Sequence, residues 1–274
     1  MTNAEIINRS SFQRLRSKNI RRAVLRRLFY VLITAVLCLL FLVICAALFF
    51  KIQEIQVTGN AIYGADELLQ ISGVKVGQNL YSVSGRAVEA RIKKACTYIR
   101  TVRMHRRLPS TLVIEVEEDT AEYFIELAGE YFALSADFRV LGRSDSKEEI
   151  LRANPGIKFI AVPELRYCVV GSELVFRRQI NLKVVEAVMA DVKLWELYNM
   201  TDFVDISDKF NIKIIAGGGK YRILLGGREE MKLKLDFAKA IIESTLASGE
   251  YAQINVEKTD SAVITFGEEP FYVP

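Results

Sequence analysis

The run of 23 residues from Leu28 to Phe50 contains no charged residue, and it constrains this 274-residue chain more than any other feature. As an α-helix it would be about 34 Å long, enough to cross a hydrocarbon core of roughly 30 Å with some tilt. A cleaved signal peptide is the main alternative, but its apolar stretch is usually only about 7–15 residues long. We therefore predict one transmembrane helix over residues 28–50.

Basic residues are concentrated before this segment. Residues 1–27 hold eight Lys or Arg and one Glu, whereas the whole chain has a net charge of only +4. Positively charged flanks stay in the cytoplasm, so this tail predicts a cytoplasmic N-terminus and an outer region over residues 51–274. The arginines nearest the span, which carry this prediction, are Arg21, Arg22, Arg26 and Arg27. The outer region is mildly acidic, which argues against binding to nucleic acid.

Residues 51–119 have the patterns of a small α+β domain. Apolar residues alternate in strand-like runs, and Gly59-Asn60 and Leu108-Pro109-Ser110 supply turns between elements. Asp66 and Glu67 suit the first turn of a short helix that Gly73 ends. The predicted order is strand–helix–helix–strand–strand, at about 52–57, 65–72, 85–98, 99–106 and 111–118.

Residues 120–266 predict a second mixed α/β domain with a largely antiparallel sheet and two long helices. The first helix, at about 178–199, has apolar residues at spacings of three and four, namely Ile180, Val184, Val188, Val192 and Trp195. Strands follow at about 203–207, 210–216 and 221–225, then a helix after Gly226-Gly227, and closing strands at 251–257 and 261–266. Residues 267–274 are expected to be a short tail.

The outer region offers no recognisable catalytic or metal site. His105 is the only histidine and lies in a predicted strand, and two separated outer cysteines do not make a zinc site with it. Gly217-Gly218-Gly219-Lys220 lacks the remaining residues of a phosphate-binding loop and reads as a hairpin turn. We expect no disulfide between Cys96 and Cys168, no cofactor, and no enzymatic activity.

These segments, in this order, resemble the FtsQ/DivIB family of bacterial cell-division proteins, which carry a POTRA domain behind a membrane span. The resemblance rests on the run from Ile52 to Asn60, on Val76 to Leu80, and on the alternating run from Val102 to Glu118. The POTRA motif residues matched here are Ile55, Val57, Gly59, Asn60 and Pro109. Some positions in this part of the chain depart from the family pattern: Asp119 replaces an arginine, Ala121 a proline, Ser135 an aspartate, and Phe138 a glycine.

The resemblance implies a divisome scaffold of the cytoplasmic membrane that acts at the septum. Family members bind the FtsB (DivIC) and FtsL subunits, and this trio regulates the enzymes that make septal peptidoglycan. The resemblance implies that the partner's outer segment pairs with the last strand of the second domain. Such a terminal strand is expected to lie at a sheet edge, where unpaired backbone groups can bind another strand. The resemblance implies that partner contact falls on Glu257, Lys258, Ala262, Ile264 and Phe266.

Some of these positions have a second interpretation. Ile264 and Phe266 could belong to the core, and for Ile264 the two interpretations have equal weight. Glu257 stands where an arginine is usual, and Lys258 stands where a tyrosine is usual. Two other functions stay open: a POTRA-containing component of protein transport or assembly, and a membrane-anchored cell-wall enzyme.

Overall fold

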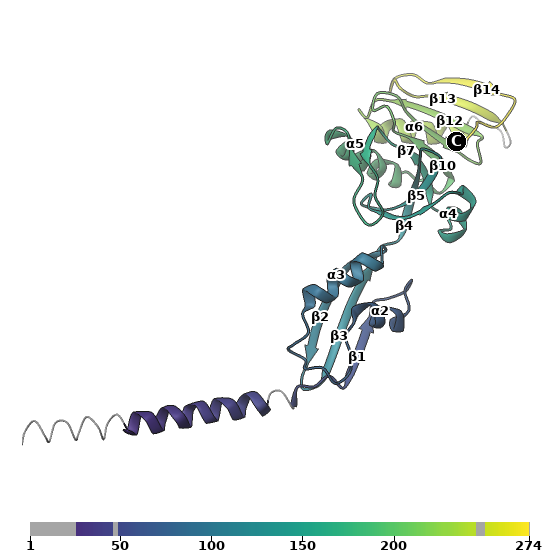
Figure 1. Cartoon of the computed structure of the whole chain (residues 1–274). Coiled ribbons are helices and arrows are strands. Elements are labelled where there is room, and N and C mark those ends of the chain that lie inside the picture. Colours follow the sequence, from purple (N-terminus) through teal and green to yellow (C-terminus); the bar gives the residue numbers. More distant parts are fainter. Residues whose placement is uncertain (1–25, 46–48, 245–249, 274) are drawn as a thin grey trace, which may run out of the picture. The chain divides into compact units, whose positions relative to one another are not determined.

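The computed structural model describes residues 26–45, 49–244 and 250–273 (Figure 1). Within these residues one helix, Arg26–Cys45, is long and apolar enough to cross a membrane, with 20 residues, a mean hydropathy of 3.0 and no burial inside the protein. The described part of this helix starts at Arg26, two residues before the predicted span, and includes Arg26 and Arg27. Arg21 and Arg22 lie outside the described residues.

The folded part of the chain divides into two compact units. One holds the chain up to Thr58 together with Gly73–Val88 and Met104–Glu115, and the other holds Gly59–Ser72, Glu89–Arg103 and Val116–Pro274. This division does not follow the boundary expected from the sequence after residue 119, which stays a prediction.

The first elements after the span have the order expected for a POTRA domain. They are β1 (Glu54–Thr58), α2 (Ala65–Ser72), α3 (Gly85–Ala95), β2 (Ile99–Arg107) and β3 (Thr111–Glu118). The sheet order is β1-β3-β2, with β1 parallel to β3 and Ile55 opposite Leu112. The helix α3 ends three residues earlier than predicted, although the Cys96 N–H still donates to the Ile92 carbonyl at 2.8 Å.

A nine-stranded mixed sheet follows, in the order β14-β13-β12-β11-β10-β7-β4-β5-β6. Most neighbouring strands are antiparallel, as predicted, but β4–β7, β7–β10 and β12–β13 are parallel. Its strands are β4 (Ala121–Leu127), β5 (Glu130–Ser135), β6 (Val140–Ser144), β7 (Lys158–Ala161), β10 (Thr201–Asp205), β11 (Ile212–Ala216), β12 (Tyr221–Gly226), β13 (Tyr251–Asn255) and β14 (Val263–Gly267). A small hairpin, β8 (Leu165–Tyr167) and β9 (Val175–Phe176), stands apart from this sheet.

Both faces of the nine-stranded sheet are buried. Helices α5 (Ile180–Lys193) and α6 (Met231–Ser244) pack on one face, where Ile160, Val204 and Ile214 contribute to the larger core. Their neighbours in the sequence point to the other face: Phe159 precedes Ile160, Phe203 precedes Val204, and Ile215 follows Ile214. These three residues form a smaller core with helix α4 (Lys147–Ala153). Successive strand side chains point to opposite faces, so the central strands are continuous apolar runs.

The prediction for the first long helix was wrong at its ends and partly wrong in its buried face. Helix α5 spans 14 residues, and a short 3-10 turn at Tyr198–Met200 is separate from it. Its buried residues are Val185, Val188, Met189 and Val192, whereas Ile180 is exposed. Ile180 is the first residue of the helix, where the chain has only just left the β8–β9 hairpin.

The segment after β14, which the sequence indicated only as a tail, packs against the sheet. The Phe271 N–H donates to the Gly219 carbonyl at 2.7 Å, and the Arg222 guanidinium lies over the Phe271 ring at 4.5 Å. Phe271 and Val273 pack against the smaller core. The end of the described chain therefore covers part of the face that α4 leaves open.

Candidate functional site

The strand β14 lies at one end of the nine-stranded sheet and pairs only with β13 in the described part of the chain (Figure 1). The pairing is antiparallel, with Ile254 opposite Ile264 and Ala252 opposite Phe266. In an antiparallel ladder alternate residues turn their N–H and C=O groups away from the partner strand. The outer side of β14 therefore presents backbone groups that a further strand could pair with.

The side chains of β14 divide into a packed set and an exposed set. Ala262, just before the strand, and Ile264 are partly buried against the larger core. Phe266 shares the face of Ile264 by strand alternation, but 60% of it is exposed, and Val263 on the other face is 63% exposed. Ile264 therefore contributes to the core, while Phe266 and Val263 are available for contact.

The other two candidate residues, Glu257 and Lys258, are exposed and lie in the turn between β13 and β14. The sequence placed residue 257 in a strand, but β13 ends at Asn255 because the Asn255 Oδ1 accepts the Glu257 N–H at 3.0 Å and turns the chain. The surroundings of this edge are acidic. Within residues 257–269 the exposed acids are Glu257, Asp260, Glu268 and Glu269, against one exposed base, Lys258.

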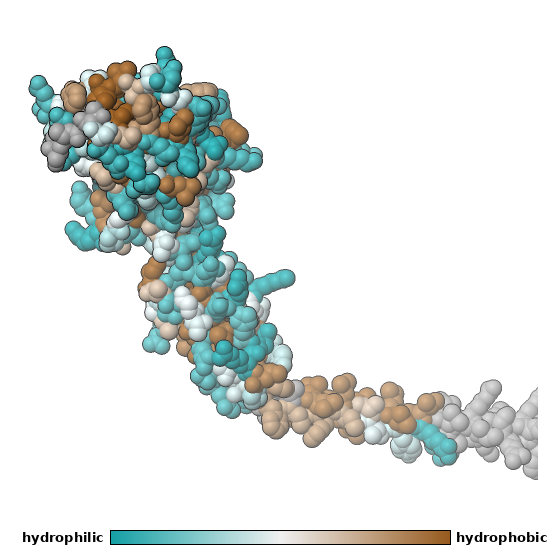
Figure 2. Space-filling view, turned by 180° about the vertical axis from the view of Figure 1, so that it is seen from behind, coloured by the Kyte–Doolittle hydropathy of each residue, from teal (hydrophilic) through white to brown (hydrophobic). Residues whose placement is uncertain are grey.

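Figure 2 shows hydrophobic side chains gathered at the end of the molecule that carries β13 and β14 in Figure 1. An apolar surface beside an open strand edge suits the binding of another polypeptide, because backbone pairing and side-chain burial can act together. This edge is the strongest candidate for a functional site in the described chain.

The POTRA motif residues shape the turn after β1 and the backbone around it. Gly59 has φ +82°, and a Cβ at this position would lie 2.1 Å from the Val116 carbonyl oxygen. Only glycine fits such a close approach. Asn60 follows and donates from Nδ2 to the Tyr63 carbonyl at 2.9 Å. The Glu118 carboxylate accepts the N–H groups of Ala61, Ile62 and Tyr63 at 2.6–3.2 Å, a role for Glu118 that the sequence did not indicate.

The remaining motif residues are structural. Ile55 and Val57 are half-buried in β1, opposite Leu112 and Ile114 of β3. Pro109 is exposed in the turn between β2 and β3, after a cis peptide bond. These three residues therefore help to build the sheet.

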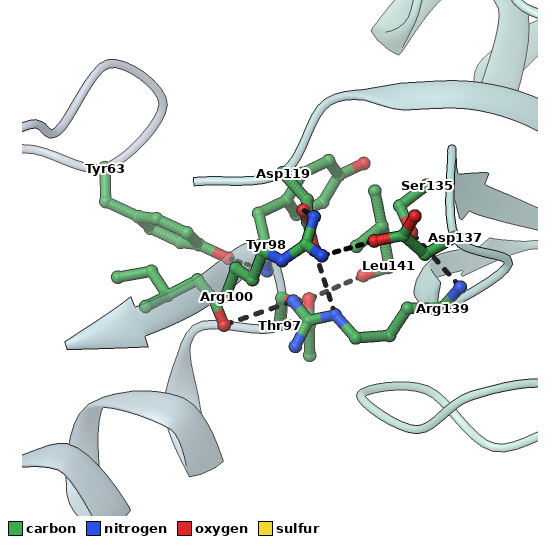
Figure 3. Close-up of polar contacts among 10 residues, drawn as sticks. Tyr63, Thr97, Tyr98, Arg100, Asp119, Ser135, Asp137, Arg139 and Leu141 are labelled. Carbon is green, nitrogen blue, oxygen red and sulfur yellow. Dashed lines mark hydrogen bonds and ion pairs between the residues drawn. The ribbon is translucent and has the colours of Figure 1, made fainter. Parts of the chain in front are cut away.

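A second cluster of polar side chains lies within the larger compact unit and centres on Arg139 (Figure 3). Its guanidinium donates to the Asp119 carboxylate at 3.0 Å, to the Ile99 carbonyl at 3.1 Å, and to the Thr97 carbonyl. The Arg139 N–H donates to the Ser135 hydroxyl at 3.1 Å. The side chain thus joins the segment around Thr97–Ile99 to the turn between β5 and β6.

Two more contacts extend this cluster. Arg100 pairs with Asp137 and, at 3.5 Å, with Asp119, and both carboxylates raise the pKa of the Arg100 guanidinium, Asp137 more strongly. The Thr97 hydroxyl donates to the Leu141 carbonyl at 2.5 Å. Asp119, which departs from the family pattern, thus forms ion pairs with two arginines, Arg100 and Arg139. The sequence did not indicate Arg139, because its partners lie about 20–42 residues away along the chain.

Phe138, in the same turn, also departs from the family pattern, and its conformation shows the consequence. It has φ +58°, a conformation that glycine adopts without strain, yet its ring is buried and stacks on Tyr123 with a centroid distance of 5.4 Å. Burial of the ring offsets the backbone strain.

No group of three or more His, Cys, Asp or Glu side chains in the described residues is placed to hold a metal ion. His105 is exposed on β2, and its Nε2 lies 3.1 Å from Glu115. Gly217–Gly219, all with positive φ, form the turn between antiparallel strands β11 and β12, as predicted. Cys96 and Cys168 are free thiols, and burial raises the pKa of the Cys168 thiol to about 11.

Comparison with known proteins defines the class of the chain. Residues 50–119 match the family of FtsQ-type POTRA domains. The chain is 29% identical to the cell division protein FtsQ of Syntrophotalea carbinolica over 43% of its own length and 42% of that protein. It is also 25% identical to the cell division protein DivIB of Clostridium acetobutylicum over 65% of its length and 63% of that protein, and 23% identical to the DivIB of Clostridium botulinum (strain Hall) over 82% and 83%.

The chain thus carries a domain similar to FtsQ-type POTRA domains at residues 50–119, and an apolar N-terminal helix long enough to cross a membrane. More specifically, it is a homologue of the FtsQ and DivIB cell-division proteins. The matches with the S. carbinolica and C. acetobutylicum proteins span less than two thirds of the length of each relative.

Proposed function

We propose that this chain is a non-enzymatic scaffold of the divisome, anchored in the cytoplasmic membrane at the septum with its N-terminus inside the cell. It binds an FtsB/DivIC-like single-pass protein by adding a strand of that partner to β14. An FtsL-like protein joins the same complex, which helps to control septal peptidoglycan synthesis. The open edge of β14 is the observation that supports this proposal most.

The exposed side chains suggest how the partner is chosen. Backbone pairing at β14 supplies affinity that depends little on sequence, while Phe266 and Val263 offer apolar contacts on the two faces of the strand. The acids around the edge favour a partner segment with basic residues near the ends of its strand, because like charges across an interface oppose binding. A basic partner residue would accommodate Glu257 in place of the arginine that is usual in the family.

The test is the affinity of the full chain in nanodiscs for the outer segment of a DivIC-like partner. Replacing Phe266 with Asp should weaken binding at least about ten-fold, because interface aromatics commonly contribute 1–2 kcal/mol or more. The matched control is Phe210→Asp, since Phe210 is similarly exposed, at 69%, and lies outside β14. Both variants should keep the circular dichroism of the parent. Equal affinities for the two variants would refute docking at β14.

We also propose that the POTRA domain assists recruitment to the division site. Replacing residues 51–119 with an unrelated small domain should reduce septal localisation of a fluorescent fusion while leaving it in the membrane. Full septal localisation of the exchanged protein would contradict this part of the proposal.

A further inference from the structure

The chain segment that leaves the membrane helix is hydrogen-bonded to two loops of the smaller compact unit. The Leu80 N–H donates to the Phe50 carbonyl at 2.7 Å, the Gly77 N–H donates to the Ile52 carbonyl at 2.8 Å, and the Ile52 N–H donates to the Gln78 carbonyl at 2.8 Å. The Gln53 N–H donates to the Ser110 carbonyl at 2.8 Å. The loop 75–81 and the turn 108–110 are therefore fixed to residues 50–53.

Covalent connectivity places these two loops close to a bilayer. Five residues lead from Cys45, the last described residue of the apolar helix, to Phe50, and five extended residues span at most about 17 Å. The start of β1, the end of β2 and the start of β3 lie at the same end of the three-stranded sheet (Figure 1). Once the helix Arg26–Cys45 is inserted, Phe50 can therefore lie no more than about 17 Å from the end of the helix at Cys45.

The side chains at this end have the composition of a membrane interface. Val76, Tyr81 and Leu108 are exposed, at 64%, 57% and 60%, although each is large and apolar or amphipathic. The ring of Tyr81 packs edge-on against Phe50 at 5.3 Å and has the Arg106 guanidinium at 5.8 Å from its centroid. Aromatic side chains with an apolar body and a polar tip gather at the boundary of headgroups and acyl chains.

The charge at this end is also suited to lipid. Residues 49–54, 75–81 and 106–110 contain four basic residues and one acid, Glu54, whereas the outer region as a whole is acidic. Arg106 is held in place because its guanidinium donates to the Leu80 and Val83 carbonyls, both at 2.9 Å. Basic residues beside a membrane attract anionic headgroups, and their long stems can lie along apolar surface.

From this arrangement we infer that the POTRA domain rests on the bilayer through a juxtamembrane surface, and that the occupant of this surface is lipid containing anionic headgroups. The juxtamembrane surface consists of Phe49, Lys51, Lys75, Val76, Tyr81, Arg107 and Leu108. Its apolar side chains enter the headgroup–acyl boundary while its basic residues contact phosphate groups. The inference rests on insertion of the apolar helix and goes beyond the proposed docking at β14.

The test uses the full chain in vesicles of phosphatidylethanolamine and phosphatidylglycerol. Trp195, the one tryptophan, is buried in the larger core and supplies a constant background in the parent chain. Tyr81→Trp and Leu108→Trp place a fluorophore on the juxtamembrane surface. Ile62→Trp is the matched control, because Ile62 is 52% exposed in the loop that Glu118 holds.

With lipids brominated near the headgroup, the added tryptophan at 81 or 108 should lose about half of its emission, and its maximum should shift to the blue. The added tryptophan at 62 should change little. Equal quenching at all three positions, or no quenching at 81 and 108, would overturn the inference. A protein partner on this surface would give the second result.

A second comparison tests the role of charge. Replacing Lys75 and Arg107 with Glu should lower the quenching of the tryptophan at 81 in the same vesicles, and unchanged quenching would contradict binding through anionic headgroups. Flotation of each variant with vesicles reports insertion of the helix independently. Loss of flotation would instead contradict the membrane anchor on which the proposed function depends.

Discussion

Replacing Arg139 with Ala should destabilise the larger compact unit by about 3 kcal/mol. Truncating one partner of a buried ion pair costs about 3–5 kcal/mol, and a hydrogen bond to a charged group contributes about 1.5–3 kcal/mol. The side chains of Arg139 and Asp119 are 19% and 9% exposed, so water compensates for only part of the loss. The Asp119 carboxylate would keep only the weaker contact with Arg100, at 3.5 Å.

The assay is thermal unfolding of the full chain in detergent, followed by circular dichroism. For a unit of this size, about 3 kcal/mol corresponds to a fall in Tm of roughly 6–12 °C. The matched control is Arg143→Ala, because Arg143 pairs with Glu130 at 3.2 Å but the two side chains are 55% and 38% exposed, far more than those of Arg139 and Asp119. Such a surface pair contributes about 0–1 kcal/mol. If Arg139→Ala lowers Tm no more than Arg143→Ala does, the Arg139 cluster does not stabilise the unit.

Three further predictions follow from individual contacts. Lys234→Ala should lower the unfolding free energy by about 2–4 kcal/mol, because the buried Nζ donates to the Leu225 and Gly227 carbonyls at 2.9 Å each. Lys232→Ala, on the exposed side of α6, should change the unfolding free energy by less than about 0.5 kcal/mol. Gly59→Ala should lower Tm strongly, because the added Cβ would overlap the Val116 carbonyl. Gly64→Ala should be tolerated, because the space around Gly64 is open, and equal Tm values for the two variants would contradict this prediction. A pKa of about 11 leaves roughly 0.1% of the Cys168 thiol as thiolate at pH 8. Site-resolved mass spectrometry should therefore find slow alkylation of Cys168 at pH 8, with a rate that rises nearly ten-fold per pH unit. Alkylation as fast as that of a free thiol would refute the burial of Cys168.

The sequence predicted best those elements that alternate on a single buried face or end at a clear turn. The strand β3 was predicted with correct bounds because Leu112, Ile114 and Val116 alternate and the turn at Pro109 precedes them. The strand β4 was missed because Tyr123, Phe124 and Ile125 are buried on both faces of the larger sheet, which removes the alternation. Helix α4, with seven residues, was too short to show a period.

The position of the candidate site in the fold was predictable to a similar extent. The sequence predicted that strand 261–266 would lie at a sheet edge, and the sheet order of the described residues, with β14 (Val263–Gly267) at one end, confirms this position. Whether Ile264 or Phe266 would be buried depended on how far the larger core extends beneath β14, which a pattern of alternating residues cannot give. The Arg139 cluster depends on carbonyl groups of distant residues, and backbone carbonyls have no sequence signature.

Docking of a partner strand on β14 is the central claim, and in-cell crosslinking tests it most directly. A photoreactive amino acid at Val263 or Phe266 should crosslink to a DivIC-like single-pass protein in dividing cells, while the same group at Phe210 should not. Crosslinks to that partner from position 210 but not from 263 or 266 would contradict the account.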